Sequence, residues 1–374
     1  MSIRKQRAVF AELLAEAGVT LNGGGKADVQ VHNEDLYGVV LAKGSLGLGE
    51  SYMDGWWDAE EVDSFFDKVL SARLETKVNK NFAAMLEGAK ARLFNQQNKE
   101  LSKRVAEEHY DLGNDLYEKM LDSRMQYTCA YWKRADNLED AQKHKLDLIC
   151  KKLQLKESDT VLELGCGWGG FAKFAAENYG CHVTAYNISK EQVAWATEKC
   201  QGLPVEFRLQ DYREASGQYD KVASIGLCEH IGYKNYNGFL KVIHNNLKDY
   251  GLALIHTIGG NHTVVKSEPW LDRYIFPGSM LPSPQQFSKT IDRRFVLEDW
   301  HNFGVDYDTT LMAWYDKFNQ NWNSLKSERY NDRFYRMWKY YLLLCAGSFR
   351  SRKNQLWQVV ISKHGLRGGY ESIR

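Results

Sequence analysis

The 374-residue sequence has no apolar stretch long enough to cross a membrane. Its longest candidate, residues 340–346, falls far short of the roughly 20 residues that a spanning helix needs. Charge of one sign is not in excess either, since 49 Lys and Arg stand against 48 Asp and Glu. A net charge of +1 creates no overall field that would attract nucleic acid or an anionic membrane. We therefore expect no nucleic-acid partner, and we expect any membrane contact to be peripheral.

The seven cysteines lack the spacing of a metal site, because no C-x-x-C pair or similar pattern occurs. No secretory segment follows Met1. These absences predict a cytoplasmic protein with reduced thiols and no bound metal. Proline is also rare, at five residues, whereas aromatic residues reach 13%. Such aromatic content suits an apolar or cation-accommodating pocket, although ordinary core packing explains most of it.

The chain is long enough for two domains. Residues 1–80 read as short helices and extended pieces, which predicts a small N-terminal domain. Residues 81–104 space their apolar side chains as one amphipathic helix does. Such a helix most simply links domains while lying on its own protein, and a membrane-surface role is the alternative. From residue 105 to residue 374, strand and helix patterns alternate, which predicts an α/β domain with a parallel sheet covered on both faces.

The predicted strands cover residues 161–164, 182–187, 205–209, 220–225, 252–257, 295–302 and 356–362. The predicted helices between them cover residues 170–179, 189–200, 233–248, 309–323 and 328–347. In a sheet of this type, ligands bind beyond the carboxyl ends of the strands.

A glycine-rich turn, Glu-Leu-Gly-Cys-Gly-Trp-Gly-Gly at residues 163–170, joins the first of these strands to a helix. Gly165 and Gly167 let the chain turn tightly and let a ligand approach the backbone, next to the N–H donors of the helix start. A dinucleotide site would need an acid about 20 residues further on, where Asn187 stands. Glu163 instead fits the turn in which a carboxylate helps to hold the aminoacyl part of S-adenosylmethionine. The pattern thus favours S-adenosylmethionine over NAD.

Polar side chains follow the next two strands. Asn187 and Gln192 are placed to bond a ribose through neutral amides. Asp211 is placed to accept the amino proton of an adenine ring, with the backbone N–H of Tyr212 meeting the ring. The structural alternative for Asp211 is a helix N-cap.

Titratable groups gather after the fourth and fifth strands. Glu229 and His230 come just past the end of one strand, and His256 ends its neighbour. A single histidine is more often a buried hydrogen-bonded residue, but groups that converge on one rim predict acid–base chemistry. Cys129 could be a nucleophile, a residue that lines the site or an inert core residue, and no basic neighbour in sequence favours the first. Tyr307 can offer a hydroxyl to a site.

Six motifs in this order resemble those of the bacterial cyclopropane-fatty-acyl-phospholipid synthases. The resemblance extends along essentially the whole chain, and the related mycolic acid cyclopropane synthases are similar from about residue 105 onward. The motifs cover residues 109–115, 126–132, 163–170, 228–232, 256–258 and 300–308. Family members often carry Ser in place of Thr128 and Thr in place of Asn187, and both exchanges keep a polar group.

The resemblance implies a class I S-adenosylmethionine-dependent methyltransferase fold, Rossmann-like with a mainly parallel sheet. It implies transfer of a methylene group to a cis double bond in an acyl chain of a membrane phospholipid, through a carbocation. The residues that it places around a proton-accepting bicarbonate are Cys129, Glu229, His256, the backbone of Ile258, and Tyr307. Together with the turn, it gives as cosubstrate-binding residues Tyr127, Thr128, Glu163, Gly165, Cys166, Gly167, Gly169, Asn187, Gln192, Asp211 and Tyr212.

Two other functions remain open at this point. A small-molecule N-methyltransferase would explain residues 105–374 but would leave residues 1–100 without a role. A non-enzymatic lipid-binding protein is a third class, and the intact glycine turn argues against it. For a lipid-modifying enzyme, the N-terminal domain and the helix at 81–104 are the natural surface for peripheral docking on the inner face of the membrane. A homodimer is compatible with this arrangement.

Overall fold

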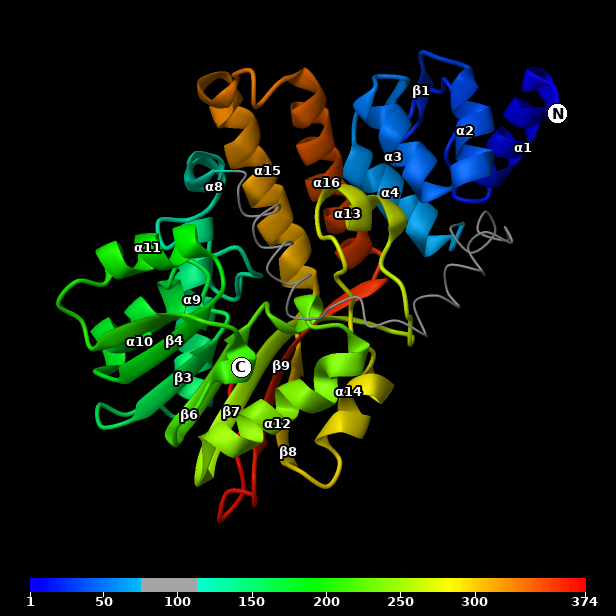
Figure 1. Ribbon diagram of the computed structural model, residues 1–374. Coiled ribbons are helices and arrows are strands. Elements are labelled where there is room, and N and C mark those ends of the chain that lie inside the picture. The colour runs from blue at the N-terminus through cyan, green and yellow to red at the C-terminus, as the bar shows by residue number, and fades with distance from the viewer. Residues whose placement is uncertain (75–112) are drawn as a thin grey trace. The chain divides into compact units, whose positions relative to one another are not determined.

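The computed structural model describes residues 1–74 and 113–374 (Figure 1). The chain forms two compact units. The described part of the first unit comprises residues 1–74, 266–277 and 307–354, and that of the second comprises residues 113–265, 278–306 and 355–374. The predicted linker helix at 81–104 and the domain boundaries near it lie outside the described residues.

The second unit is built on a seven-stranded sheet with the strand order β5-β4-β3-β6-β7-β9-β8 (Figure 1). Its strands are β3 (Thr160–Leu164), β4 (His182–Asn187), β5 (Val205–Leu209), β6 (Tyr219–Ile225), β7 (Leu247–Gly260), β8 (Val296–Asn302) and β9 (Asn354–Ser362). The pairs β5–β4, β4–β3, β3–β6 and β6–β7 are parallel, whereas β8 and β9 pair antiparallel. All seven predicted strands are present, and the mainly parallel α/β sheet is confirmed.

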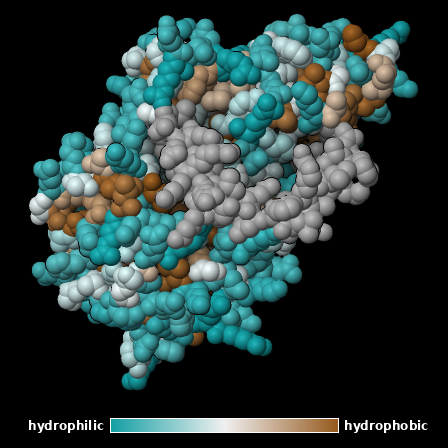
Figure 2. Space-filling view, viewed as in Figure 1, coloured by the Kyte–Doolittle hydropathy of each residue, from teal (hydrophilic) through white to brown (hydrophobic). Residues whose placement is uncertain are grey.

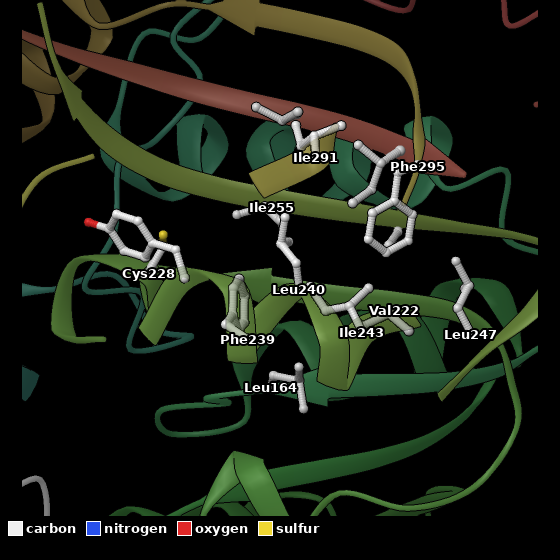
Figure 3. Packing of buried hydrophobic residues seen from close by; sticks show 14 of the residues in the cluster. Leu164, Val222, Cys228, Phe239, Leu240, Ile243, Leu247, Ile255, Ile291 and Phe295 are labelled. Atoms are coloured by element: carbon white, nitrogen blue, oxygen red, sulfur yellow. The ribbon is translucent and has the colours of Figure 1, made fainter. Parts of the chain in front are cut away.

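Helices cover both faces of this sheet. The helices of this unit are α8 (Asn114–Met120), α9 (Leu138–Lys152), α10 (Gly170–Tyr179), α11 (Lys190–Lys199), α12 (Tyr236–Asn246) and α14 (Pro284–Ile291), with the short turns η1 (Tyr212–Glu214), η2 (Cys228–His230) and η3 (Tyr233–Asn235). Helices α9 and α10 pack on one face of the sheet, and α12 and α14 pack on the other. Side chains alternate across the pleat, so that Val161 packs in the core with α9 and α10, while Leu162 packs in the core with α12 and α14. Figure 3 shows the second of these cores, with Phe239 and Leu240 of α12 beside Ile255 of β7.

Several predicted elements differ from the structure in their bounds, and strand pairing explains two of these differences. Strand β7 begins at Leu247 and not at residue 252, because its pairing with β6 begins there, opposite Tyr219, and it ends at Gly260 and not at residue 257. The predicted helix at 233–248 is divided into η3 and α12 and ends at Asn246 for the same reason.

The first unit collects helices from distant parts of the chain. Its elements are α1 (Ile3–Ala15), β1 (Gln30–Val31), α2 (Asp35–Lys43), α3 (Ser45–Met53), β2 (Trp57–Asp58), α4 (Val62–Ser71), α13 (Pro269–Tyr274), α15 (Val305–Leu325) and α16 (Asp332–Arg350). Helices α4 and α16 approach closely, since a Cβ atom on Gly347 would lie 2.6 Å from the Cβ atom of Phe66. The Arg336 guanidinium, on α16, donates to the backbone carbonyls of Tyr52 and Trp57. The sequence pattern predicts α15 and α16 but not their grouping with the N-terminal helices.

Within residues 1–74 and 113–374, no helix combines the length and the apolar composition needed to cross a membrane.

Candidate functional site

The glycine-rich turn has the predicted strand-turn-helix geometry. The backbone N–H groups of Gly165 and Cys166 both donate to the carbonyl oxygen of Tyr186, at 2.9 and 3.1 Å, which ties the turn to the end of β4. Gly165 and Gly167 have φ values of +81° and +53°, in the left-handed region that disfavours a side chain. Gly169, also left-handed, stands at the N-cap of α10. A ligand can therefore approach bare backbone beside the start of a helix.

Glu163 is the last residue but one of β3, two residues before Gly165, and is 2% exposed. One carboxylate oxygen accepts from the backbone N–H of Ala172, on α10. The other oxygen, Oε2, is buried and has no hydrogen-bond partner among the described residues. Burial raises the pKa of Glu163 to about 8, and the charge of Lys145 opposes this rise. A buried carboxyl with one open oxygen is suited to hold a cationic group.

Asn187 and Gln192 form a linked pair of amides beside the turn. The Asn187 amide donates to the carbonyl of Gly167 at 3.1 Å and to the side-chain oxygen of Gln192 at 2.9 Å. The hydroxyl of Ser189 caps the start of α11 by accepting from the Gln192 N–H. The neutral pair is thus fixed at the end of β4, where the sequence places a ribose contact.

Asp211 caps η1, as the structural alternative predicts. Its side chain accepts from the Arg213 N–H at 2.9 Å and lies 3.4 Å from the Arg213 guanidinium. Tyr212 is buried against Phe239, edge to face. The adenine-binding role of both residues stays a prediction, and capping is compatible with it because the cap leaves the carboxylate at the strand-end rim.

Helix α9 holds the segment 126–129 through two buried side chains. Gln142 donates its amide hydrogens to the backbone oxygens of Gln126 and Thr128. Lys145 donates to the side-chain oxygens of the same two residues, at 2.5 and 2.8 Å. The segment crosses the end of β6, since a Cβ atom on Gly226 would lie 2.7 Å from the Thr128 methyl carbon.

Tyr127 and Cys129 of this segment are placed as follows. The Tyr127 ring packs edge to face on Tyr117, with centroids 5.1 Å apart. Cys129 is fully buried, and its thiol donates to the Ala130 carbonyl at 3.2 Å. A buried thiol next to a carbonyl fits a residue that lines the site better than a nucleophile.

Glu229 stands in η2, just past the end of β6. Its Oε1 accepts from the backbone N–H of Ile258 at 2.7 Å, while Oε2 is buried without a partner among the described residues. Burial raises the pKa of Glu229 to about 7, and the hydrogen bond from the Ile258 N–H opposes the rise. The carboxyl is therefore poised near neutrality, with one oxygen open.

His256 lies on β7, the strand next to β6, and is 1% exposed. Its Nδ1 is 3.2 Å from the side-chain amide nitrogen of Gln358, and its Nε2 is buried without a partner among the described residues. Burial lowers its pKa well below the usual value, and the charges of Lys145 and Lys152 lower it further. With the amide donating to Nδ1, the neutral ring carries its proton on Nε2, which makes that atom an available donor.

The two remaining residues that the sequence singles out are His230 and Tyr307, and neither has an open polar atom shown at this rim. His230 is neutral near pH 7, because burial lowers its pKa to about 4. Tyr307 belongs to α15 in the first unit, where its ring stacks on Phe349 with centroids 4.5 Å apart. The structure thus brings Glu229, His256 and Ile258 together at one rim, and the role of Tyr307 stays a prediction.

Sequence reasoning missed Gln142, Lys145 and Gln358. The two residues of α9 are polar residues on a helix and read as a solvated face, while Gln358 interrupts an apolar strand. Of these three residues, only Gln358 could have been found from the sequence, because a glutamine inside a buried strand needs a buried hydrogen-bond partner.

Comparison with known proteins gives consistent results. Residues 96–359 match the family model described as mycolic acid cyclopropane synthetase. The chain is 52% identical to the cyclopropane-fatty-acyl-phospholipid synthase of Escherichia coli (strain K12), over 97% of this chain and 94% of that protein. It is 33% identical to a probable fatty acid methyltransferase of Pseudomonas putida, over 68% of each chain.

Solved structures show the same fold. The mycolic acid cyclopropane synthase CmaA1, complexed with SAH and CTAB, is 29% identical with a TM-score of 0.64, covering 70% of this chain and 98% of that one. The cyclopropane synthase MmaA2 from Mycobacterium tuberculosis is 28% identical with a TM-score of 0.65, at the same coverage. Coclaurine N-methyltransferase, at 21% identity and a TM-score of 0.71 over 84% of this chain and 99% of that one, shares the fold alone.

Proposed function

The chain belongs to the mycolic acid cyclopropane synthetase family and is an S-adenosylmethionine-dependent methyltransferase, and from this premise we propose that it converts cis double bonds in membrane phospholipid acyl chains into cyclopropane rings. The observation that carries the proposal is 52% identity, over 97% of the chain, to an enzyme named for this reaction. The open groups at Glu163, Glu229 and His256 support it, because each matches a need of the chemistry.

The reaction has two steps. The alkene carbon attacks the methyl carbon of the sulfonium, so that a C–C bond forms, the C–S bond breaks, and S-adenosylhomocysteine leaves. The other alkene carbon becomes a carbocation. Loss of one proton from the transferred methyl group then closes the three-membered ring. A pocket for this sequence must exclude water and tolerate a cation, which aromatic faces stabilise by roughly 0.5–2 kcal/mol each.

We assign cosubstrate binding to residues at the carboxyl ends of β3 and β4. Glu163 would hold the ammonium group through its open oxygen, and the bare backbone of Gly165, Cys166, Gly167 and Gly169 would pass alongside. The linked amides of Asn187 and Gln192 would bond the ribose.

The remaining cosubstrate contacts complete this binding surface. Asp211 and Tyr212 would meet the adenine, and Tyr127 and Thr128 would close the site from the segment that α9 holds. Backbone and neutral groups dominate this set, which limits the number of nucleophilic side chains that the sulfonium could alkylate.

We assign proton removal to Glu229, which follows β6, and to His256, on β7. A bicarbonate ion, when bound, would supply a weak base. Because the ion exchanges with solution, its alkylation would not inactivate the protein as alkylation of a side chain would. The open groups fit such an ion, because the free oxygen of Glu229 can accept its hydroxyl proton and the Nε2–H of His256 can donate to its oxygens. The Ile258 N–H, which donates to Glu229, fixes that carboxylate. Cys129 completes the proposed set in the second unit, and a share of Tyr307 in it rests on the sequence resemblance alone.

The lipid substrate must come from a membrane. We assign peripheral docking on the inner face of the membrane to the N-terminal residues, including the segment 81–104 outside the described residues. In the described part, α1 exposes Ile3 to 47% and the preceding Met1 to 65%. Exposed apolar side chains at one chain end favour contact with a lipid surface.

The test is a labelling assay. The full-length protein is incubated with S-adenosylmethionine labelled in its methyl group and with vesicles of unsaturated phospholipid, and in parallel with a panel of small amines. We expect label in acyl chains that are heavier by one CH2 group and have lost their double bond. Label in the amine extract, with unchanged acyl chains, would assign the protein to N-methylation instead.

A further inference from the structure

Lys145 is a charged residue with no exposed surface. It lies on α9, and its ammonium donates to the amide oxygen of Gln126 and to the hydroxyl oxygen of Thr128. Because Thr128 accepts from Lys145, its own O–H is left to donate elsewhere. Two neutral oxygens compensate only part of the free energy that burial of an ammonium costs. A buried charge in this position needs a charged group nearby.

Lys145 is tied to the glycine turn that follows Glu163, because the Gln126 amide to which it donates leaves no room for a Cβ atom on Gly170. Acidic groups act on the ammonium from these surroundings. Asp122, Cys129 and Glu163 all raise the pKa of Lys145, against the effect of burial, which lowers it to about 8. Asp122 is already engaged, since its oxygens accept backbone N–H groups of the 124–126 turn. Cys129 donates to a carbonyl. Of the three, Glu163 is therefore the acid with a buried oxygen, Oε2, that has no hydrogen-bond partner among the described residues.

The surroundings of Glu163 contain no second cation among the described residues whose charge acts on its pKa. The thiols of Cys150, Cys166 and Cys200 interact with it electrostatically from α9, from the turn and from the end of α11. Burial raises the pKa of all three thiols, so they are neutral near pH 7. Lys145 is thus the group that favours the carboxylate form of Glu163.

We propose that Lys145 is a positioning residue that acts through Glu163, favouring its ionised form so that the open Oε2 can hold the ammonium group of the cosubstrate, while it also fixes Gln126 and Thr128 alongside. The inference rests on the proposed function for the identity of that ligand. It assigns to α9, which the glycine turn does not include, a share in cosubstrate binding.

Proton release provides the first test. With the Glu163 pKa raised to about 8, the free protein carries this carboxyl mostly protonated at pH 7. Binding of S-adenosylhomocysteine, which presents the same ammonium group, should then release about one proton at pH 7 and weaken as the pH falls below about 8. Titration calorimetry in two buffers of different ionisation enthalpy measures this release. Binding that releases no proton at pH 7, in the unaltered protein and in Lys145→Met alike, would overturn the proposal.

A charge-removing variant and a matched control provide the second test. Lys145→Met should raise the pKa of Glu163 further, so that affinity for S-adenosylhomocysteine falls about tenfold at pH 7 and the affinity-against-pH curve moves up by about one unit. Gln142→Met is the control, because Gln142 holds the same segment from the same helix without a charge. We expect the control to weaken binding equally at every pH.

The Glu163→Gln background shows whether Lys145 acts through Glu163. In that background, adding Lys145→Met should cause no further shift of the pH curve, whereas a persisting shift would overturn the proposal. A uniform loss of affinity in Lys145→Met, parallel to the Gln142 control, would reduce the lysine to a packing role. If Lys145→Met does not fold, Lys145→Gln replaces it, since it keeps a donor and removes the charge.

These binding measurements are independent of the reaction. A protein that binds S-adenosylhomocysteine with the expected proton release but forms no cyclopropane product would contradict the proposed function and leave this inference standing. A protein that forms the product, but whose affinity-against-pH curve does not move in Lys145→Met, would contradict this inference and leave the proposed function standing.

Discussion

Two buried glutamates lie near the carboxyl ends of the neighbouring strands β3 and β6 and differ in what surrounds them. Glu163, on β3, has one oxygen on a backbone N–H, one oxygen open, and a buried lysine facing it. Glu229, after β6, has the same division of its oxygens, but no nearby cation acts on its pKa, and an uncharged His256 lies on the next strand. Glu163, whose pKa is raised to about 8, therefore needs a further cation, such as the ammonium group of a ligand, before it carries a charge near pH 7, whereas Glu229, whose pKa is raised to about 7, can exchange a proton there.

The difference teaches how one strand-end rim can separate binding from chemistry. A cation beside a carboxylate favours its charged form, but burial opposes that form, and at Glu163 burial outweighs Lys145. A pKa near the working pH, as at Glu229, suits proton exchange. Each prediction below changes one side of this comparison and asks whether the other side responds.

The largest effect is expected for Glu229→Gln. The amide keeps the shape and can still accept the Ile258 N–H, but it cannot accept a proton. Turnover should fall by at least about a hundredfold, the range for loss of a general base, while the Kd for S-adenosylhomocysteine stays within about twofold. Product assay and calorimetry on the same preparation check this. A Kd that rises in step with the loss of rate would show that Glu229 belongs to the cosubstrate-binding site and not to a separate region for proton removal.

Removal of bicarbonate should have the next largest effect. In rigorously carbonate-free buffer, activity should fall by about tenfold or more and return when bicarbonate is added, because the proposed base is exchangeable. In Glu229→Gln, added bicarbonate should restore little. Full activity of a preparation shown to carry no carbonate would sink the bicarbonate assignment.

Gly167→Val tests the binding region. The residue has φ +53°, and no atom lies within 4 Å of an added Cβ, so the change strains the backbone and fills the space for the ligand. Affinity for S-adenosylhomocysteine should fall about tenfold or more. Gly202→Val is the matched control, with φ +81° and equally open surroundings in the turn after α11. Equal loss of affinity in both variants would show that backbone strain alone, not ligand access, is responsible.

The pH profile separates the two carboxyls in the unaltered protein. Glu229 must be ionised to accept a proton, and its pKa is raised to about 7. At saturating cosubstrate, kcat should therefore be level above about pH 8 and should fall about tenfold per unit well below pH 7. This limb should be absent from the residual rate of Glu229→Gln. A profile of unchanged shape in the variant would assign the limb to another group.

Much of this site could be read from the sequence because its parts are local. The glycine turn, Asn187 and Glu229 each follow directly on an apolar strand, and parallel strands bring such positions to one edge. Strands β4 and β5 have the predicted bounds to the residue.

The parts that could not be read depend on tertiary contacts. Lys145 resembles any surface lysine in sequence, and its burial is set by the segment 126–129 that packs over it. The grouping of α16 with α4 likewise rests on packing at Gly347, between segments about 280 residues apart. It also means that a chain truncated near residue 100 would uncover the packed face of α16, so point substitutions are the better probe of membrane docking.

The smallest effect is expected for Ile3→Asp, which tests docking without touching either carboxyl. Ile3 is 47% exposed on α1, so its replacement removes apolar surface and adds a negative charge with little effect on the fold. Removing one partly buried contact at a lipid interface, at about 25 cal/mol per Å², should weaken binding to phospholipid vesicles by about threefold to tenfold in a sedimentation assay. Leu209→Asp is the control, because Leu209 is 49% exposed on β5 in the second unit. Affinity for S-adenosylhomocysteine should be unchanged in Ile3→Asp. Equal vesicle binding by Ile3→Asp and the unaltered protein would remove α1 from the docking surface, and a weaker binding of Leu209→Asp would move that surface to the sheet edge instead.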